Sequence, residues 1–136
     1  MILFIAFLSS CNNKPKTENE KVMELLLSKN ELKITNETKN ICILTENSCI
    51  ACNRAFSSYL KKEIDNKSTI LIVNASGQMV DISHFQEIKS DNVFLHKFHD
   101  SFFNKSRLIK LTNKKIDTII DINVDTIETI VSKPSL

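Results

Sequence analysis

Hydrophobic and polar residues follow two different periodicities along this chain, and each periodicity predicts one kind of element. Apolar residues that recur every three or four positions predict amphipathic helices, and continuous apolar runs of strand length predict strands that are buried on both faces. The expected helices span residues 20–29, 49–64, 80–90 and 125–133. The expected strands span 40–45, 68–74 and 92–98, followed by two β-rich runs within 106–122. Residues 33–40 are mostly polar, which is typical of a loop or an edge strand.

Local signals predict how several of these elements begin and turn. The polar turn "TNKK" should join the two runs of 106–122 into an antiparallel hairpin. Ile127, Ile130 and Val131 are expected to form the inner face of the last helix. The expected helix caps are Ser48 before Cys49, Asp81 or Ser83 before the helix at 80–90, and Asp125 with Glu128 as a capping box.

The order of the elements predicts the fold class. Alternating strands and helices imply parallel strands with right-handed crossovers, and the terminal hairpin adds antiparallel strands. The sequence therefore predicts an α/β domain with a mixed sheet of about five strands, flanking helices and a C-terminal β-hairpin followed by a helix.

Composition narrows the classes of function. The chain has 136 residues, of which 42% are hydrophobic and 25% charged, so a single globular domain is expected. Its net charge of +2 is too small to favour nucleic acid as a partner. Gly77 is the only glycine, which argues against glycine-rich phosphate loops and dinucleotide-binding motifs. We expect a monomer without a cofactor.

The first residues predict an exported, anchored protein. "MILFIAFL" is too short to span a bilayer but fits the apolar core of a signal peptide. The following "LSSC", ending at Cys11, resembles the lipobox of bacterial lipoproteins, in which the signal is removed before a cysteine that then carries the lipid. This resemblance implies a signal peptide at 1–10, a polar tether at 11–21 and a domain at 22–136. It also implies an extracytoplasmic protein of the cell envelope, periplasmic in a Gram-negative organism, held to the membrane by its lipid.

The stretch "ILTENSCIACNRAF" carries the candidate chemistry, because Cys49 and Cys52 stand three residues apart where a strand gives way to a helix. Two such thiols form a redox dithiol, half of a zinc site, or a packed pair. A cysteine at a helix N-terminus should have a lowered pKa, since unpaired backbone N–H groups stabilise its thiolate. Cys49 has that position, and Cys52 lies on the apolar stripe one turn later. Cys42, within an apolar run, is expected to be a buried thiol.

The motif and its placement resemble the thioredoxin fold. Residues 40–133 resemble the domain of membrane-tethered thioredoxin-like proteins of the TlpA type, which combine it with a signal anchor or a lipobox. The resemblance implies thiol–disulfide exchange with protein thiols or disulfides, with Cys49 as the nucleophile and Cys52 as the resolving thiol. This chain departs from the family's pattern before the hairpin, where Lys105 and Ser106 occupy the place of a cis-proline that faces the dithiol. Glu46, the nearest carboxylate, is a candidate for proton transfer.

Two alternatives use the same residues differently. A zinc site would combine Cys49 and Cys52 with His96 and His99, but 43 residues separate Cys52 from His96, far more than in compact zinc motifs. No metal is therefore expected. A redox-inactive lipoprotein that keeps the fold as a binding or structural module is the other alternative, because a fold does not determine a function.

Overall fold

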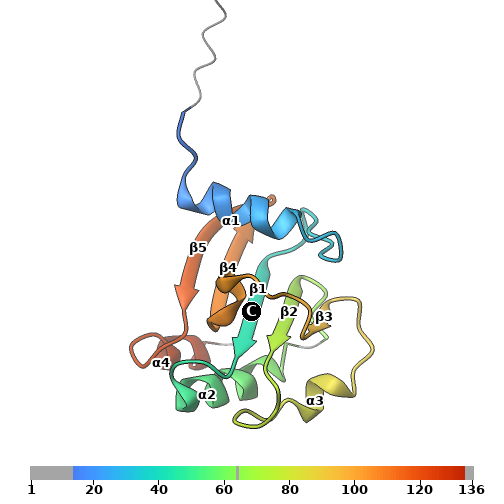
Figure 1. Cartoon of the computed structure of the whole chain (residues 1–136), viewed down its shortest axis with the longest axis vertical. Helices are drawn as coiled ribbons and strands as arrows, with labels where there is room; N and C mark the ends of the chain where they lie inside the picture. Colours follow the sequence, from blue (N-terminus) through green and yellow to red (C-terminus); the bar gives the residue numbers. More distant parts are fainter. Residues whose placement is uncertain (1–13, 64, 134–136) are drawn as a thin grey trace, which may run out of the picture.

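The computed structural model describes residues 14–63 and 65–133, which form one mixed sheet with helices on both faces (Figure 1). The five strands lie in the order β3-β2-β1-β4-β5. The first three are mutually parallel, and β4 and β5 form an antiparallel hairpin that pairs with β1. The strands are β1 (Asn40–Thr45), β2 (Thr69–Asn74), β3 (Val93–Leu95), β4 (Arg107–Thr112) and β5 (Lys115–Asp121).

The helices complete the predicted order of elements, so the α/β fold class with a mixed five-stranded sheet is confirmed. They are α1 (Glu18–Leu27), α2 (Ile50–Leu60), α3 (Ser83–Gln86) and α4 (Ile127–Val131), with a 3₁₀ turn η1 (Ser101–Asn104). In Figure 1, α1 lies at the top of the view, and α2, α3 and α4 lie below the sheet.

The central strand β1 separates two hydrophobic cores. Its side chains alternate between the faces, as strand geometry requires. Cys42 and Leu44 pack with residues of α2, α3 and α4, whereas Ile41 and Ile43 pack with α1 and η1. All six residues of β1 are buried, which explains why the sequence shows a continuous apolar run there. The loop that follows β1 is thus carried by the best-buried strand of the sheet.

Both terminal helices differ from the prediction. α1 begins at Glu18, inside the expected tether, because Thr17 and Glu20 form a capping box there. The predicted capping box of the last helix is wrong: Thr126 is the N-cap, and the Asn123 side chain accepts the N–H groups of residues 125 and 126. Val131 is 38% exposed, so its expected inward position is wrong, whereas Ile127 and Ile130 are buried as predicted.

The predicted cap of the third helix is also wrong, because Ile82, not Asp81 or Ser83, is the N-cap of α3. The other differences outside the site concern length. α2 ends at Leu60 rather than at residue 64, α3 has only four residues, and β3 only three. For residues 33–40 a loop or an edge strand was expected; residues 33–39 form a loop, and Asn40 begins β1. The expected lipid attachment at Cys11, and the signal peptide expected before it, lie outside the described residues. Within residues 14–63 and 65–133, no helix has both the length and the apolar character to cross a membrane.

Candidate functional site

Cys49 and Cys52 lie where β1 ends and α2 begins, and their sulfur atoms form a disulfide. Their Cα atoms are 5.2 Å apart. Cys52 is 3% exposed and packs in the core between α2 and the sheet, whereas Cys49 is only partly buried. The two predicted site cysteines are therefore brought together, and the first of them is the more accessible.

Cys49, not Ser48, is the N-cap of α2, which corrects the sequence prediction. Its Sγ accepts a hydrogen bond from the N–H of Cys52 at 3.2 Å. Ser48 adopts a left-handed conformation with φ of 63°, which residues other than glycine rarely do. Because of this turn, α2 begins one residue later than predicted, and the N–H of Cys52 faces the sulfur of Cys49. A helix N-terminus stabilises a thiolate, because its unpaired N–H groups carry partial positive charge.

Glu46 is tied to the loop that follows β2. Its carboxylate accepts hydrogen bonds from the backbone N–H groups of Ser76, Gly77, Met79 and Val80, at 2.8–3.1 Å, and from the Ser76 hydroxyl. Partial burial acts to raise the pKa of Glu46, but these hydrogen bonds outweigh it and lower the pKa to about 2. So weak a base is poorly suited to proton transfer near neutral pH. These hydrogen bonds instead make Glu46 an anchor for the loop of residues 76–80.

Two asparagines fix the rest of the loop before the dithiol. The Asn47 side chain donates to the carbonyl oxygen of Asn104 at 3.0 Å, which joins this loop to η1. The fully buried Asn53, in α2, donates its amide to the carbonyl oxygen of Asn47 at 2.7 Å. Neither asparagine was predicted from the sequence to be part of the site. The only signal was a polar side chain beside the apolar stripe of the helix.

Ser106 and Lys105, the predicted partner-facing residues, differ in what they present. Ser106 is 2% exposed, and its Oγ accepts a hydrogen bond from the N–H of Thr45 at 2.9 Å. Its side chain therefore points into the fold and holds the end of β1. Lys105 is exposed, and its ammonium lies 3.9 Å from the carboxylate of Asp121. Of the two residues, only Lys105 offers its side chain to solvent.

The third described cysteine, Cys42, is completely buried in β1 and unpaired. Burial first, and the negative charge of Glu63 second, raise the pKa of the Cys42 thiol above its ordinary value. Thiols exchange as thiolates, so Cys42 should be inert in the folded protein. The predicted buried role of this residue is confirmed.

The structure does not assemble the alternative zinc site. In the part of the chain that it describes, no three His, Cys, Asp or Glu side chains lie close enough to hold a metal ion. Cys49 and Cys52 are joined to each other, and His84, His96 and His99 are all exposed.

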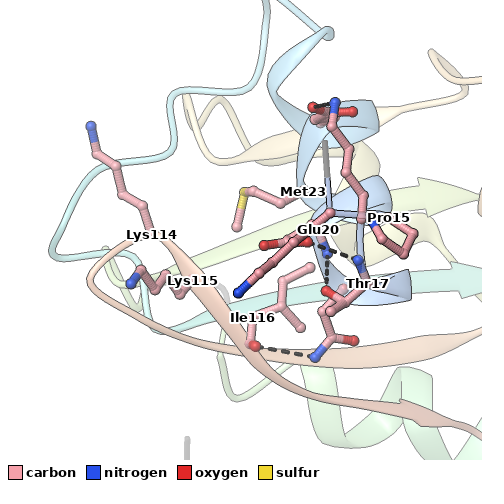
Figure 2. Close-up of a pocket in the computed structure, with 11 residues that line it drawn as sticks. Pro15, Thr17, Glu20, Met23, Lys114, Lys115 and Ile116 are labelled. Carbon is pink, nitrogen blue, oxygen red and sulfur yellow. Dashed lines mark hydrogen bonds and ion pairs between the residues drawn. The ribbon is translucent and has the colours of Figure 1, made fainter. Parts of the chain in front are cut away.

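A pocket of about 680 Å³ lies at the other end of the sheet, between α1 and the β4–β5 turn (Figure 2). Lys110 of β4 pairs with Asn40 at the start of β1, so the turn lies far from the end of β1 that leads to the dithiol. Met23 and Ile116 form part of the pocket wall, and Lys114 and Lys115 form its rim. This pocket and the dithiol are separate features.

Comparisons of the chain with protein-family models, with curated proteins and with solved structures give no match. The candidate site therefore rests on the residues and their geometry.

Proposed function

We propose that this chain is a thioredoxin-like protein that exchanges thiols and disulfides through Cys49 and Cys52. The observation that carries the proposal is the cap of α2, where the partly exposed Cys49 sulfur receives the N–H of Cys52. The order of elements supports the thioredoxin-like assignment, because a β-α-β unit is followed by a β-hairpin that pairs with β1 and by a helix. Cys42 is buried away from exchange, so the proposed chemistry involves two thiols only.

The proposed reaction has two steps. The Cys49 thiolate attacks one sulfur of a partner disulfide, which forms a Cys49–partner bond, breaks the partner's S–S bond and releases one partner thiolate. The Cys52 thiolate then attacks the Cys49 sulfur, forms the internal disulfide and releases the second partner thiolate. Two electrons pass from the dithiol to the partner, and water protonates the released thiolates. In the reverse direction, a partner dithiol reduces the Cys49–Cys52 disulfide.

The proposal is tested by redox titration of the full chain carrying Cys11→Ser, equilibrated with oxidised and reduced dithiothreitol and followed by thiol trapping. We expect Cys49 and Cys52 to convert together between dithiol and disulfide, while Cys42 stays reduced. A protein in which the two cysteines do not form a reversible disulfide with each other would lack the proposed activity, and a binding module would then be the better interpretation.

We also propose that Cys11 carries a lipid that anchors the protein outside the cytoplasm. The apolar segment and "LSSC" that precede the polar residues support this. In bacteria fed a radiolabelled fatty acid, the natural chain should be labelled and recovered with membranes, and Cys11→Ala should be neither. Equal labelling of the two proteins would contradict the anchor without affecting the redox proposal.

A further inference from the structure

The loop that follows β2 packs along α2, the helix that begins next to Cys49. The Nε of Arg54, in α2, donates to the carbonyl oxygen of Met79 at 2.9 Å, and the hydroxyl of Ser57 donates to that of Asp81 at 3.0 Å. Val80 belongs to the same core as Cys52. Figure 1 shows the chain running beside α2 between β2 and α3. The loop and the helix are thus in contact over about one turn of α2.

Glu46 supplies the other attachment of this loop. The N–H groups of Ser76, Gly77, Met79 and Val80 converge on its carboxylate, and such a concave set of backbone donors is a strong anion-binding arrangement. Here the anion is part of the protein itself. Because Glu46 stands three residues before Cys49, the same short segment holds both the loop and the disulfide.

The only glycine of the chain is used in this arrangement. Gly77 has a φ of 90°, which other residues adopt only with strain, and its N–H donates to Glu46 at 3.0 Å. A Cβ at this position would approach the side chain of Ile82 to 3.2 Å. Both the backbone conformation and the space therefore favour glycine.

The loop presents an apolar side chain to solvent beside the dithiol helix. Met79 is 50% exposed, although its N–H and its carbonyl oxygen are held by Glu46 and Arg54. Methionine is flexible and polarisable, and it adapts to different apolar partners. A fixed backbone with an exposed methionine suits a contact with another protein chain.

From these contacts we infer that Glu46 is a positioning residue, which holds the Ser76–Val80 loop so that Met79 contacts the protein segment whose disulfide or thiol reacts with Cys49. The inference rests on the proposed exchange activity and adds a recognition surface to it. The occupant is a polypeptide segment that brings an apolar side chain next to its reacting cysteine. A small disulfide has no such segment and would not use the loop.

The positioning role is tested by amide hydrogen exchange on the oxidised full chain carrying Cys11→Ser, which requires no redox activity. Glu46→Ala should increase the exchange rates of the amides of Ser76, Gly77, Met79 and Val80, and leave those of β1 and β2 unchanged. The matched control is Glu87→Ala, which removes an exposed carboxylate next to α3. Unchanged exchange in the Ser76–Val80 loop of Glu46→Ala would overturn the positioning role.

The recognition role is tested by comparing a protein disulfide, insulin, with a small one, dithiobis(nitrobenzoate), as substrates of the reduced protein. Met79→Ser and Glu46→Ala should each lower kcat/KM for insulin by about tenfold, mainly through KM, since a buried methionine contact is worth that much. The rate with the small disulfide should change less than about twofold, because it makes no contact with the loop. Leu27→Ser, which removes an equally exposed apolar side chain from α1, should alter neither rate.

The possible outcomes separate the two proposals. Equal losses with both disulfides would show that the loop acts on the dithiol itself and would overturn the recognition role. The recognition role would also be overturned if Met79→Ser and Glu46→Ala both reacted with insulin as fast as the natural protein. Wild-type protein that reacts with neither disulfide would remove the proposed function, and with it the recognition role, whereas the amide-exchange result on Glu46 would still stand.

Discussion

The two ends of the sheet differ in how many side chains hydrogen-bond to the backbone of another segment. At the end that leads to the dithiol, side chains bond to the backbone of distant loops: Glu46 to residues 76–80, Asn47 to Asn104, and Ser106 to Thr45. At the other end, one such bond joins the Asn19 side chain to the carbonyl oxygen of Ile116. The pocket there is bordered by an ion pair between Lys16 and Glu24, whose side chains are 56% and 59% exposed.

The difference shows which end has a defined shape. Bonds from a side chain to backbone groups fix the path of a loop, and their loss leaves partly buried groups without partners. Ion pairs between exposed side chains contribute little and hold no backbone in place. We therefore expect substitutions around the dithiol to have larger consequences than substitutions of comparable chemistry near α1, and the following predictions test this expectation.

The largest effect is expected from the two cysteines themselves. Cys49→Ser should abolish the proposed exchange, because the proposed nucleophile is lost, whereas Cys52→Ser should accumulate mixed disulfides between Cys49 and partner proteins. In the reduced natural protein, Cys49 should be alkylated fastest. Its alkylation rate should rise at a pH below about 8.5, the pKa of an ordinary thiol. Mass spectrometry of trapped complexes and of alkylated peptides provides the measurement.

Cys42 serves as the internal control for this experiment. It is completely buried, and it should be alkylated only after denaturant unfolds the chain. If Cys52 proved the faster thiol, or if Cys49→Ser trapped the same partners as Cys52→Ser, the assigned roles would be wrong.

A smaller effect is expected from the buried amide that holds the loop. Asn53→Ala should lower the free energy of unfolding by about 1–3 kcal/mol, because the Asn47 carbonyl loses a donor and a buried side chain is removed. Asn19→Ala is the matched control at the other end, since the partly buried Asn19 amide donates to the carbonyl oxygen of Ile116 at 3.2 Å. Asn19→Ala should lower the free energy of unfolding by about 0.5–1 kcal/mol.

Urea denaturation followed by circular dichroism measures both values. Equal costs at Asn53 and Asn19 would contradict the proposed difference between the two ends of the sheet.

The comparison also indicates what the sequence could predict. Apolar patterns located every strand, and β1 and β2 appeared close to their predicted bounds, because burial on two faces leaves a continuous hydrophobic run. The C-x-x-C spacing and its place after a strand were enough to predict that Cys49 and Cys52 would meet. These features depend on neighbours in the chain or on a repeating pattern.

The missed features depend on contacts between distant residues. Nothing near Glu46 in the sequence indicates that its partners lie 30 or more residues later. Ser48 was expected as the helix cap on its residue type, but a left-handed turn gave that position to Cys49. The helix after Asp121 took its cap interactions from Asn123, one of several polar residues that local propensity ranks as equally good.

The pH dependence of stability should identify the contribution of Glu46. Its pKa is lowered from 4.5 to about 2 in the folded protein, so between these values the unfolded chain binds a proton that the folded chain does not. The stabilisation is therefore complete above about pH 4.5 and decreases as the pH falls towards 2. Glu46→Gln should be less stable than the natural protein at pH 6, and the difference should shrink as the pH is lowered to about 2.

Thermal unfolding across this pH range gives the measurement, and Glu87→Gln is the control for removing a negative charge near α3. A difference between natural protein and Glu46→Gln that stays constant with pH would mean that the carboxylate charge is not what the loop binds.

The smallest effect is expected from the ion pair between Lys16 and Glu24 beside the α1 pocket. Lys16 and Glu24 are both more than half exposed, so water and salt screen their attraction, and ordering two long side chains costs entropy. A double-mutant cycle of Lys16→Ala and Glu24→Ala should give a coupling energy of at most about 0.5 kcal/mol, which 1 M salt removes. Glu24 does not take part in the α1 capping box, so the cycle leaves that cap intact. A coupling energy of 2 kcal/mol or more would be typical of a desolvated pair, and it would mean that this end of the molecule is as firmly defined as the dithiol end.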